Sequence, residues 1–200
     1  MPARAAIQLT AVAAEAKTCR RCPLYRNATQ TVFGEGPASA AIMLVGEQPG
    51  DQEDLAGRPF VGPAGKILDR ALAEAGIDRR QAYLTNAVKH FKNEPRGKKR
   101  LHKRPNRSEI EVCRYWLGRE IALLQPDLIV ALGVTAAETL AGRKMTITRE
   151  RGRAVEFAGG QKGIVTIHPS SILRQPDDAS RHAAYAGLVK DLKLALKLAA

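Results

Sequence analysis

The sequence predicts an α/β protein, a three-layer α/β/α sandwich with a central four-stranded parallel sheet. Four short apolar runs are continuous rather than alternating, as in strands that are buried on both faces of a sheet. Segments with helical spacing of apolar residues separate these runs, and this alternation is typical of parallel sheets covered by helices. The four predicted strands are residues 41–45, 82–88, 128–132 and 164–167.

The composition indicates one globular domain with an anionic partner. With 200 residues, of which 44% are hydrophobic, we expect a single domain over residues 1–200. The net charge of +12 favours a nucleic-acid or anionic-surface partner. Residues 5–17 are predicted to form an amphipathic helix rather than a signal peptide, and no apolar run reaches membrane-spanning length. We therefore expect a cytoplasmic monomer with no membrane partner.

Helix starts are marked by two capping boxes. Ser108 with Glu111 has the required spacing and begins a helix before the third strand, and Thr135 with Glu138 repeats that spacing after it. The other expected elements are a helix at residues 67–75 that stops at Gly76, a hairpin around Gly159 and Gly160, and a final helix from about Ser180.

Polar residues follow three of the four predicted strand ends. Glu47 and Gln48 come after the first strand, Asn86 lies near the end of the second, and His168 follows the fourth. Ligands of such sheets bind beyond the carboxyl ends of the strands, so we expect these side chains to converge. Each alone could be a turn or cap residue. Together with Phe60, they supply the stacking ring, amide and imidazole that can hold a nucleic-acid base.

A basic segment at residues 92–107 contains eight Lys or Arg among sixteen residues, with His102 among them. Pro95, Gly97 and Pro105 interrupt any regular period, so we predict a long loop inserted in the domain. Such a run is either a solvated surface segment or a loop that binds a polyanion and delivers an imidazole to it.

Three cysteines and one histidine are candidate metal ligands: Cys19, Cys22, Cys113 and His90. The odd number of cysteines argues against a disulfide framework. Three thiolates with an imidazole suit structural zinc, and an iron–sulfur cluster with one histidine ligand is the alternative. A third reading is that Cys113 is only a buried helix residue.

Five motifs spread over most of the chain have the pattern of a known family. They are residues 46–51 (GEQPGD), 57–62 (GRPFVG), 85–90 (TNAVKH), 98–102 (KKRLH) and 168–170 (HPS). In this order they resemble the iron–sulfur uracil-DNA glycosylases of the family-four group. They are more similar still to the UdgX class, which becomes covalently attached to uracil-containing DNA.

Three departures from ordinary family-four members are similar to features of the UdgX class. Gln48 stands where ordinary members have a small residue, His90 stands where they have cysteine, and they lack the basic insert. One departure from the UdgX class itself remains, because the loop reads Lys-Lys-Arg-Leu-His where that class has Lys-Arg-Arg-Ile-His. Charge and shape are kept, so we expect the same chemistry.

The resemblance implies a uracil-DNA glycosylase-like fold and excision of uracil from DNA, preferably single-stranded. It implies that His102 attacks C1′ of the sugar, with Glu47 and Gln48 assisting it, and that His168 donates to the departing uracil. Phe60 and Asn86 would hold the base, with Gly46 and Asp51 also binding substrate. The implied phosphate contacts are Lys98, Lys99, Arg100, Lys103 and Arg104.

The resemblance also implies a [4Fe-4S] cluster, in place of zinc, held by the three cysteines and His90, with no further small-molecule cofactor. Two alternatives to the covalent reaction remain open at this point. One is a conventional multiple-turnover uracil-DNA glycosylase in which His102 only contacts phosphate. The other is a non-catalytic DNA-binding module organised by a metal site.

Overall fold

The computed structural model describes residues 2–200 and contains a five-stranded sheet in the order β2-β1-β5-β7-β6. The first four strands run parallel, which confirms the predicted sheet, and β6 adds an antiparallel edge strand that was not predicted. The turn at Gly159 and Gly160 joins β6 to β7, so the expected hairpin is confirmed. The strands are β1 (Ile42–Gly46), β2 (Tyr83–Asn86), β5 (Leu128–Leu132), β6 (Ala154–Glu156) and β7 (Lys162–Thr166).

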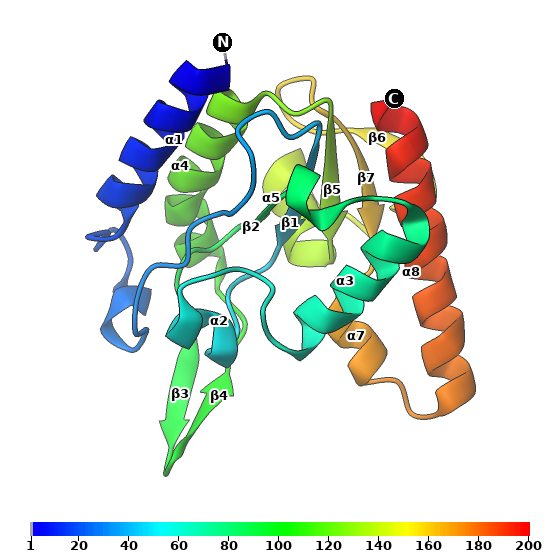
Figure 1. Ribbon diagram of the computed structural model, residues 1–200. Coiled ribbons are helices and arrows are strands. Elements are labelled where there is room, and N and C mark those ends of the chain that lie inside the picture. Colours follow the sequence, from blue (N-terminus) through cyan, green and yellow to red (C-terminus); the bar gives the residue numbers. More distant parts are fainter. Residues whose placement is uncertain (1) are drawn as a thin grey trace.

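Helices cover both faces of this sheet, as the predicted three-layer arrangement requires (Figure 1). Successive residues of a strand point to opposite faces. Ile42 and Leu44 of β1 therefore belong to one hydrophobic cluster, and Met43 and Val45 to the other. The helices are α1 (Pro2–Ala16), α2 (Asp51–Ala56), α3 (Pro63–Ala75), α4 (Arg107–Leu124), α5 (Val134–Ala141), α6 (Ile147–Glu150), α7 (Pro169–Leu173) and α8 (Asp178–Ala199), with short 3-10 helices η1 (Pro23–Arg26) and η2 (Arg79–Gln81).

The basic segment is a β-hairpin, so the prediction of a long loop was wrong. Strands β3 (Asn93–Arg96) and β4 (Lys99–His102) pair antiparallel, with Asn93 opposite His102. A hairpin of two strands has two free edges, which is why Pro95 is tolerated. Gly97 takes the positive φ of 58° that the tight turn needs. The hairpin projects beyond the sheet at the same end as α7 (Figure 1).

Both predicted capping boxes were wrong in detail. Helix α4 is capped by Asn106, whose side chain accepts from the Glu109 N–H at 2.9 Å, while the Glu109 carboxylate accepts from the Asn106 N–H at 2.7 Å. This box lies two residues before the predicted one. Helix α5 has Gly133 at its cap and therefore no side-chain cap, and the Thr135 hydroxyl, inside the helix, donates to Glu47. Helix α8 begins close to the predicted position.

Candidate active site

A cavity of about 1080 Å³ opens at the carboxyl ends of the parallel strands. It is lined by residues at the ends of all four parallel strands and by His102 of the hairpin. The sequence predicted convergence at three of these strand ends. Of the residues singled out in the sequence, the lining contains Glu47, Gln48, Asp51, Phe60, Asn86, His102, Arg104 and His168. It does not include Lys98, Lys99, Arg100 or Lys103, which lie outside the cavity on the hairpin or beside it.

An aromatic ring and an amide meet at the floor of the cavity. A Cβ atom built on Gly46 would lie 2.4 Å from Oδ1 of Asn86 and 2.7 Å from the Phe60 ring, so only glycine leaves room for both. Phe60 has a φ of 56°, an unfavourable left-handed conformation for a bulky residue. A Cβ on Gly65 would overlap the Phe60 carbonyl, so that glycine permits the strained turn. The hydrogen bonds among residues 2–200 leave the Asn86 side-chain amide unused, so it can bind a ligand.

His168 is held as a neutral imidazole with its proton on Nε2. The backbone N–H of Ser170 donates to Nδ1 at 3.2 Å, so Nδ1 is an acceptor and carries no proton. Burial, together with the charges of Arg174 and His102, lowers the pKa of His168 to about 4. The His168 and Phe60 rings are stacked with centroids 6.2 Å apart. This places an N–H donor beside the ring that would hold a base.

Gln48 determines which nitrogen of His102 carries the proton. Its Oε1 accepts from the Lys92 N–H at 2.9 Å, and its Nε2 donates to the Lys103 carbonyl at 2.8 Å, so the orientation of the amide is set by the backbone. The same Nε2 lies 2.8 Å from Nε2 of His102. Because an amide nitrogen can only donate, Nε2 of His102 must present a lone pair.

The electrostatics around His102 favour the neutral ring. Partial burial lowers its pKa, and the charge of Arg174 adds to this effect, while the Glu47 carboxylate opposes it. Even so, 53% of the His102 side chain is exposed, so a substrate can reach it. The arrangement provides a neutral nucleophile with its lone pair at the edge of the cavity.

Glu47 is positioned by residues that the sequence did not mark for this role. Its Oε2 accepts from the hydroxyl of Thr135 and lies 3.7 Å from Nε of Arg104. Arg104 also donates to the Thr135 hydroxyl at 3.1 Å. These contacts direct Oε1 of Glu47 towards Nε2 of His102, which is 4.0 Å away. Thr135 lies 88 residues from Glu47, and only its capping-box spacing drew attention to it in the sequence.

Several of the predicted phosphate-binding residues are ion-paired within the protein. Arg100 pairs with Asp51 at 2.7 Å and with the fully buried Asp54 at 2.6 Å, so it ties the hairpin to α2. Lys103 pairs with Glu94 at 2.6 Å across the hairpin. Arg104 faces Glu47. Among the ion pairs of residues 2–200, none includes Lys98 or Lys99, whose charges remain available to a ligand.

Cys22 and Cys113 belong to a buried cluster with Ala16 and Trp116 between α1, η1 and α4, and the partly buried Cys19 packs against it. The Lys89 backbone N–H donates to Sγ of Cys113 at 3.2 Å, and the Trp116 indole donates to Sγ of Cys19 at 3.1 Å. Burial raises the pKa of Cys22 and raises that of Cys113 to about 12. Their thiols therefore need a bound cation to become thiolate ligands.

The fourth predicted ligand, His90, follows directly after Lys89 and is 4% exposed. Nε2 of His90 is 2.9 Å from the Thr31 hydroxyl. That hydroxyl donates its only hydrogen to the Ala16 carbonyl, so it must accept the hydrogen bond from His90, and Nε2 carries the proton. This leaves Nδ1 with the lone pair. Within residues 2–200, no three His, Cys, Asp or Glu side chains surround a single point closely enough for one metal ion. The chemical nature of these residues, thiols that accept N–H···S hydrogen bonds, nevertheless suits them as ligands of a metal group.

The fold and the cavity define the class of this protein. It is an α/β protein with a site suited to a flat heterocycle beyond the carboxyl ends of a parallel sheet. The chain belongs to the Uracil DNA glycosylase superfamily, which it matches over residues 33–193. This confirms the resemblance at the level of the superfamily and of its α/β fold.

The curated relatives cover most of the chain. It is 39% identical over 180 residues to the Type-4 uracil-DNA glycosylase of Thermotoga maritima, with 90% of each chain aligned. It is 37% identical over 167 residues to the Type-4 enzyme of Pyrobaculum aerophilum, covering 80% of this chain and 82% of the relative. The Type-4 enzyme of Archaeoglobus fulgidus is 36% identical over 169 residues, or 81% of each chain.

No helix in residues 2–200 is long and apolar enough to cross a membrane.

Proposed function

We propose that this protein excises uracil from DNA, preferably single-stranded, and that His102 then becomes bonded to C1′ of the sugar, as in the UdgX class. The superfamily membership and the Type-4 relatives support the excision step. The observation that carries the covalent step is the hydrogen bond from Gln48 to Nε2 of His102. That bond places the lone pair of a neutral imidazole on Nε2, at the edge of the cavity.

Recognition of uracil falls to Phe60 and Asn86. The uracil must leave the base stack to enter the cavity, where Phe60 stacks on it. The Asn86 amide bonds its polar edge. Cytosine presents an amino group where uracil has a carbonyl, so an amide that donates to this position distinguishes them. The backbone carbonyl of Asn86 accepts from the buried ammonium of Lys89 at 2.7 Å, which holds this end of β2 in place.

His168 assists the departure of uracil. As the N-glycosidic bond breaks, its electron pair passes to the uracil ring and negative charge builds on the uracil oxygens. A neutral imidazole with its proton on Nε2 can donate a hydrogen bond to such an oxygen. Burial keeps the ring neutral, since its pKa is lowered to about 4. The sugar is left with the character of an oxocarbenium cation.

His102 captures this cation in place of water. The lone pair on Nε2 exchanges the hydrogen bond from Gln48 for a bond to C1′, which gives an alkylated imidazolium that can release its Nδ1 proton to solvent. The uracil anion takes a proton from water. The Glu47 carboxylate, 4.0 Å from Nε2, stabilises the cationic sugar and the imidazolium. Thr135 and Arg104 hold that carboxylate in place.

A [4Fe-4S] cluster with a structural role is also part of the proposal, with Cys19, Cys22, Cys113 and His90 as its ligands. The buried thiols, the two N–H···S bonds and the free Nδ1 of His90 support it. When bound, the cluster supplies the positive charge that keeps the thiols ionised. Iron content and visible absorbance of the purified protein test this assignment. A colourless protein with one equivalent of zinc would contradict it.

A denaturing gel tests the function. The protein is mixed in excess with a labelled single-stranded oligonucleotide that contains one uracil, and the mixture is boiled in detergent. We expect a retarded band, and none with thymine in place of uracil. Released uracil above one per protein without that band would indicate a conventional multiple-turnover enzyme. DNA binding without any release of uracil would indicate a non-catalytic module.

A further inference from the structure

We propose that the cysteine segment, residues 17–26, is a second phosphate-binding surface that holds the DNA strand where it leaves the cavity. The inference rests on the proposed function only in taking DNA as the ligand. It assigns to the segment around the Cys-x-x-Cys pair a role besides holding metal.

The cysteine segment carries positive charge that the protein does not neutralise. Lys17, Arg20, Arg21 and Arg26 are all exposed, and residues 16–34 contain no Asp or Glu. Among the ion pairs of residues 2–200, none includes any of these four side chains. A phosphate can therefore pair with them without displacing a carboxylate.

Aromatic rings, rather than carboxylates, orient these arginines. The guanidinium groups of Arg20 and Arg26 lie 5.7 and 6.0 Å from the centroid of the Tyr25 ring. Arg21 lies 4.3 Å from the centroid of Tyr115 on α4. A ring holds a guanidinium in place but leaves its charge and its N–H donors free for phosphate. Basic surfaces with interspersed aromatic rings are typical of single-stranded nucleic-acid binding.

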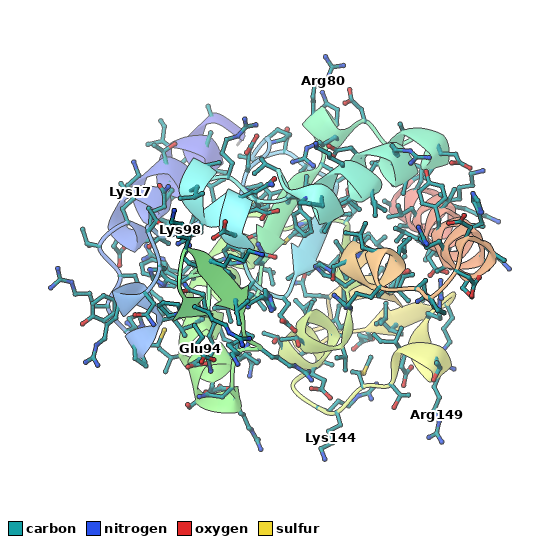
Figure 2. The ribbon with its side chains drawn as sticks, turned by 90° about the horizontal axis from the view of Figure 1, so that it is seen from below. Lys17, Arg80, Glu94, Lys98, Lys144 and Arg149 are labelled. Atoms are coloured by element: carbon teal, nitrogen blue, oxygen red, sulfur yellow. The ribbon has the colours of Figure 1, made fainter. Side chains whose placement is uncertain are left out.

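The cysteine segment adjoins the hairpin that carries His102. Immediately after the segment, the Asn27 carbonyl accepts from the Asn93 side chain at 2.9 Å, and the Thr29 hydroxyl accepts from Arg100 at 3.0 Å. In Figure 2, Lys17 and the hairpin residue Lys98 lie on one side of the molecule, away from Lys144 and Arg149. A strand whose uracil enters the cavity beside His102 can thus continue onto the segment.

Binding measurements with two lengths of DNA test the proposal. Each single-stranded oligonucleotide carries one 2′-fluoro-deoxyuridine, which resists cleavage; one has about five nucleotides and the other about thirty. Fluorescence anisotropy is followed over a range of salt concentrations. For the triple variant Arg20→Gln/Arg21→Gln/Arg26→Gln, we expect affinity for the long oligonucleotide to fall by on the order of tenfold at low salt. Its salt slope should flatten by about 2, from about 0.7 per lost phosphate contact, and short-oligonucleotide binding should be unchanged.

The matched control is the triple variant Lys190→Gln/Lys193→Gln/Lys197→Gln, which removes the same charge from the exposed face of α8, across the molecule (Figure 1). It should bind both lengths as the unmodified protein does. Two of the arginines lie between Cys19 and Cys22, so their replacement could also release the metal. The iron content of each protein is therefore measured, and the double variant Lys17→Gln/Arg26→Gln removes charge outside the cysteine pair. Equal losses in both triple variants, or an equal loss for both lengths, would overturn the proposal. Length-dependent binding without uracil release from an unmodified uracil oligonucleotide would instead defeat the proposed function alone.

Discussion

The hairpin and the cysteine segment are both strongly basic, but the structure uses their charges differently. On the hairpin and just beyond it, Arg100, Lys103 and Arg104 each face a carboxylate of the protein. In the cysteine segment, the arginines lie over tyrosine rings and pair with no acid among residues 2–200. The first arrangement fixes the position of a structural element, and the second leaves charge available. Density of Lys and Arg in a sequence therefore does not indicate how many of those charges are free to bind a polyanion.

The difference has a physical cause in the neighbours of each region. The hairpin packs against α2, whose Asp51 and Asp54 follow directly from the strand end that carries Glu47. Asp54 is fully buried, and a buried carboxylate needs a partner to offset its desolvation. The cysteine segment contains no Asp or Glu, and tyrosine rings hold its guanidinium groups instead.

Loss of His102 is the change with the largest expected effect, and it tests whether the hairpin delivers a nucleophile. In His102→Gly, we expect the covalent adduct to disappear on the boiled gel, since no other lone pair is held at that position. Water can then enter and capture the sugar, so uracil release should continue beyond one per protein. DNA affinity should be kept, in contrast to the cysteine-segment variants. An adduct that persists in this variant would mean that another residue is the nucleophile.

The contact between Gln48 and His102 should matter next. Gln48→Ala removes the donor that selects the tautomer and one anchor of the hairpin, and we expect adduct formation to slow by on the order of 100-fold. Single-turnover kinetics on a uracil oligonucleotide measure this rate separately from uracil release. Asn93→Ala, which loses a different anchor at the base of the hairpin, is the control. An equal slowing in both variants would assign Gln48 a purely structural role.

The pH dependence should separate the two basic regions. His102 reacts as the neutral ring, and partial burial lowers its pKa below the ordinary value of histidine. Adduct formation should be constant at the higher pH values and fall to half of its maximum at a pH below about 6.5, then decline by about tenfold per unit once the ring is largely protonated. Arginines do not titrate in this range, so binding through the cysteine segment should not weaken. A half-maximal rate at or above a pH of about 6.5 would contradict the lowered pKa.

Two neighbouring residues of β4 allow the smallest effects to be compared within the hairpin itself. Arg100→Gln leaves Asp54 without its cation, and we expect a loss of about 2 kcal/mol in the free energy of unfolding, measured with urea. Lys99→Gln removes a charge that pairs with no acid among residues 2–200. We expect its stability to change by less than about 0.5 kcal/mol and its salt slope for DNA binding to flatten by about 0.7.

The reverse outcome for this pair would be informative. If Arg100→Gln flattened the salt slope as much as Lys99→Gln without loss of stability, the ion pairs with Asp51 and Asp54 would not hold in solution. Arg100 would then be a phosphate contact, as the sequence had suggested, and the contrast between the two basic regions would be lost.

Much of the site could be predicted from the sequence because its residues follow strand ends. Continuous apolar runs mark buried strands, and parallel strands bring their carboxyl ends to one edge, so Glu47, Asn86 and His168 were expected to converge. The hairpin was not predicted, because Pro95 and Gly97 are as typical of a loop as of a short two-stranded ribbon. Its pairing depends on packing against α2 rather than on local period.

The sequence by itself determined the layers, the strand ends and the residue types of the site, since periodicity and turn chemistry are local properties. Only the tertiary structure decided what each polar group does. Gln48 and His102 are 54 positions apart, Arg100 and Asp51 are 49, and Thr135 and Glu47 are 88. Hydrogen bonds and ion pairs act over a few ångströms of space, so tautomers and free charges follow from which distant segments the fold brings together.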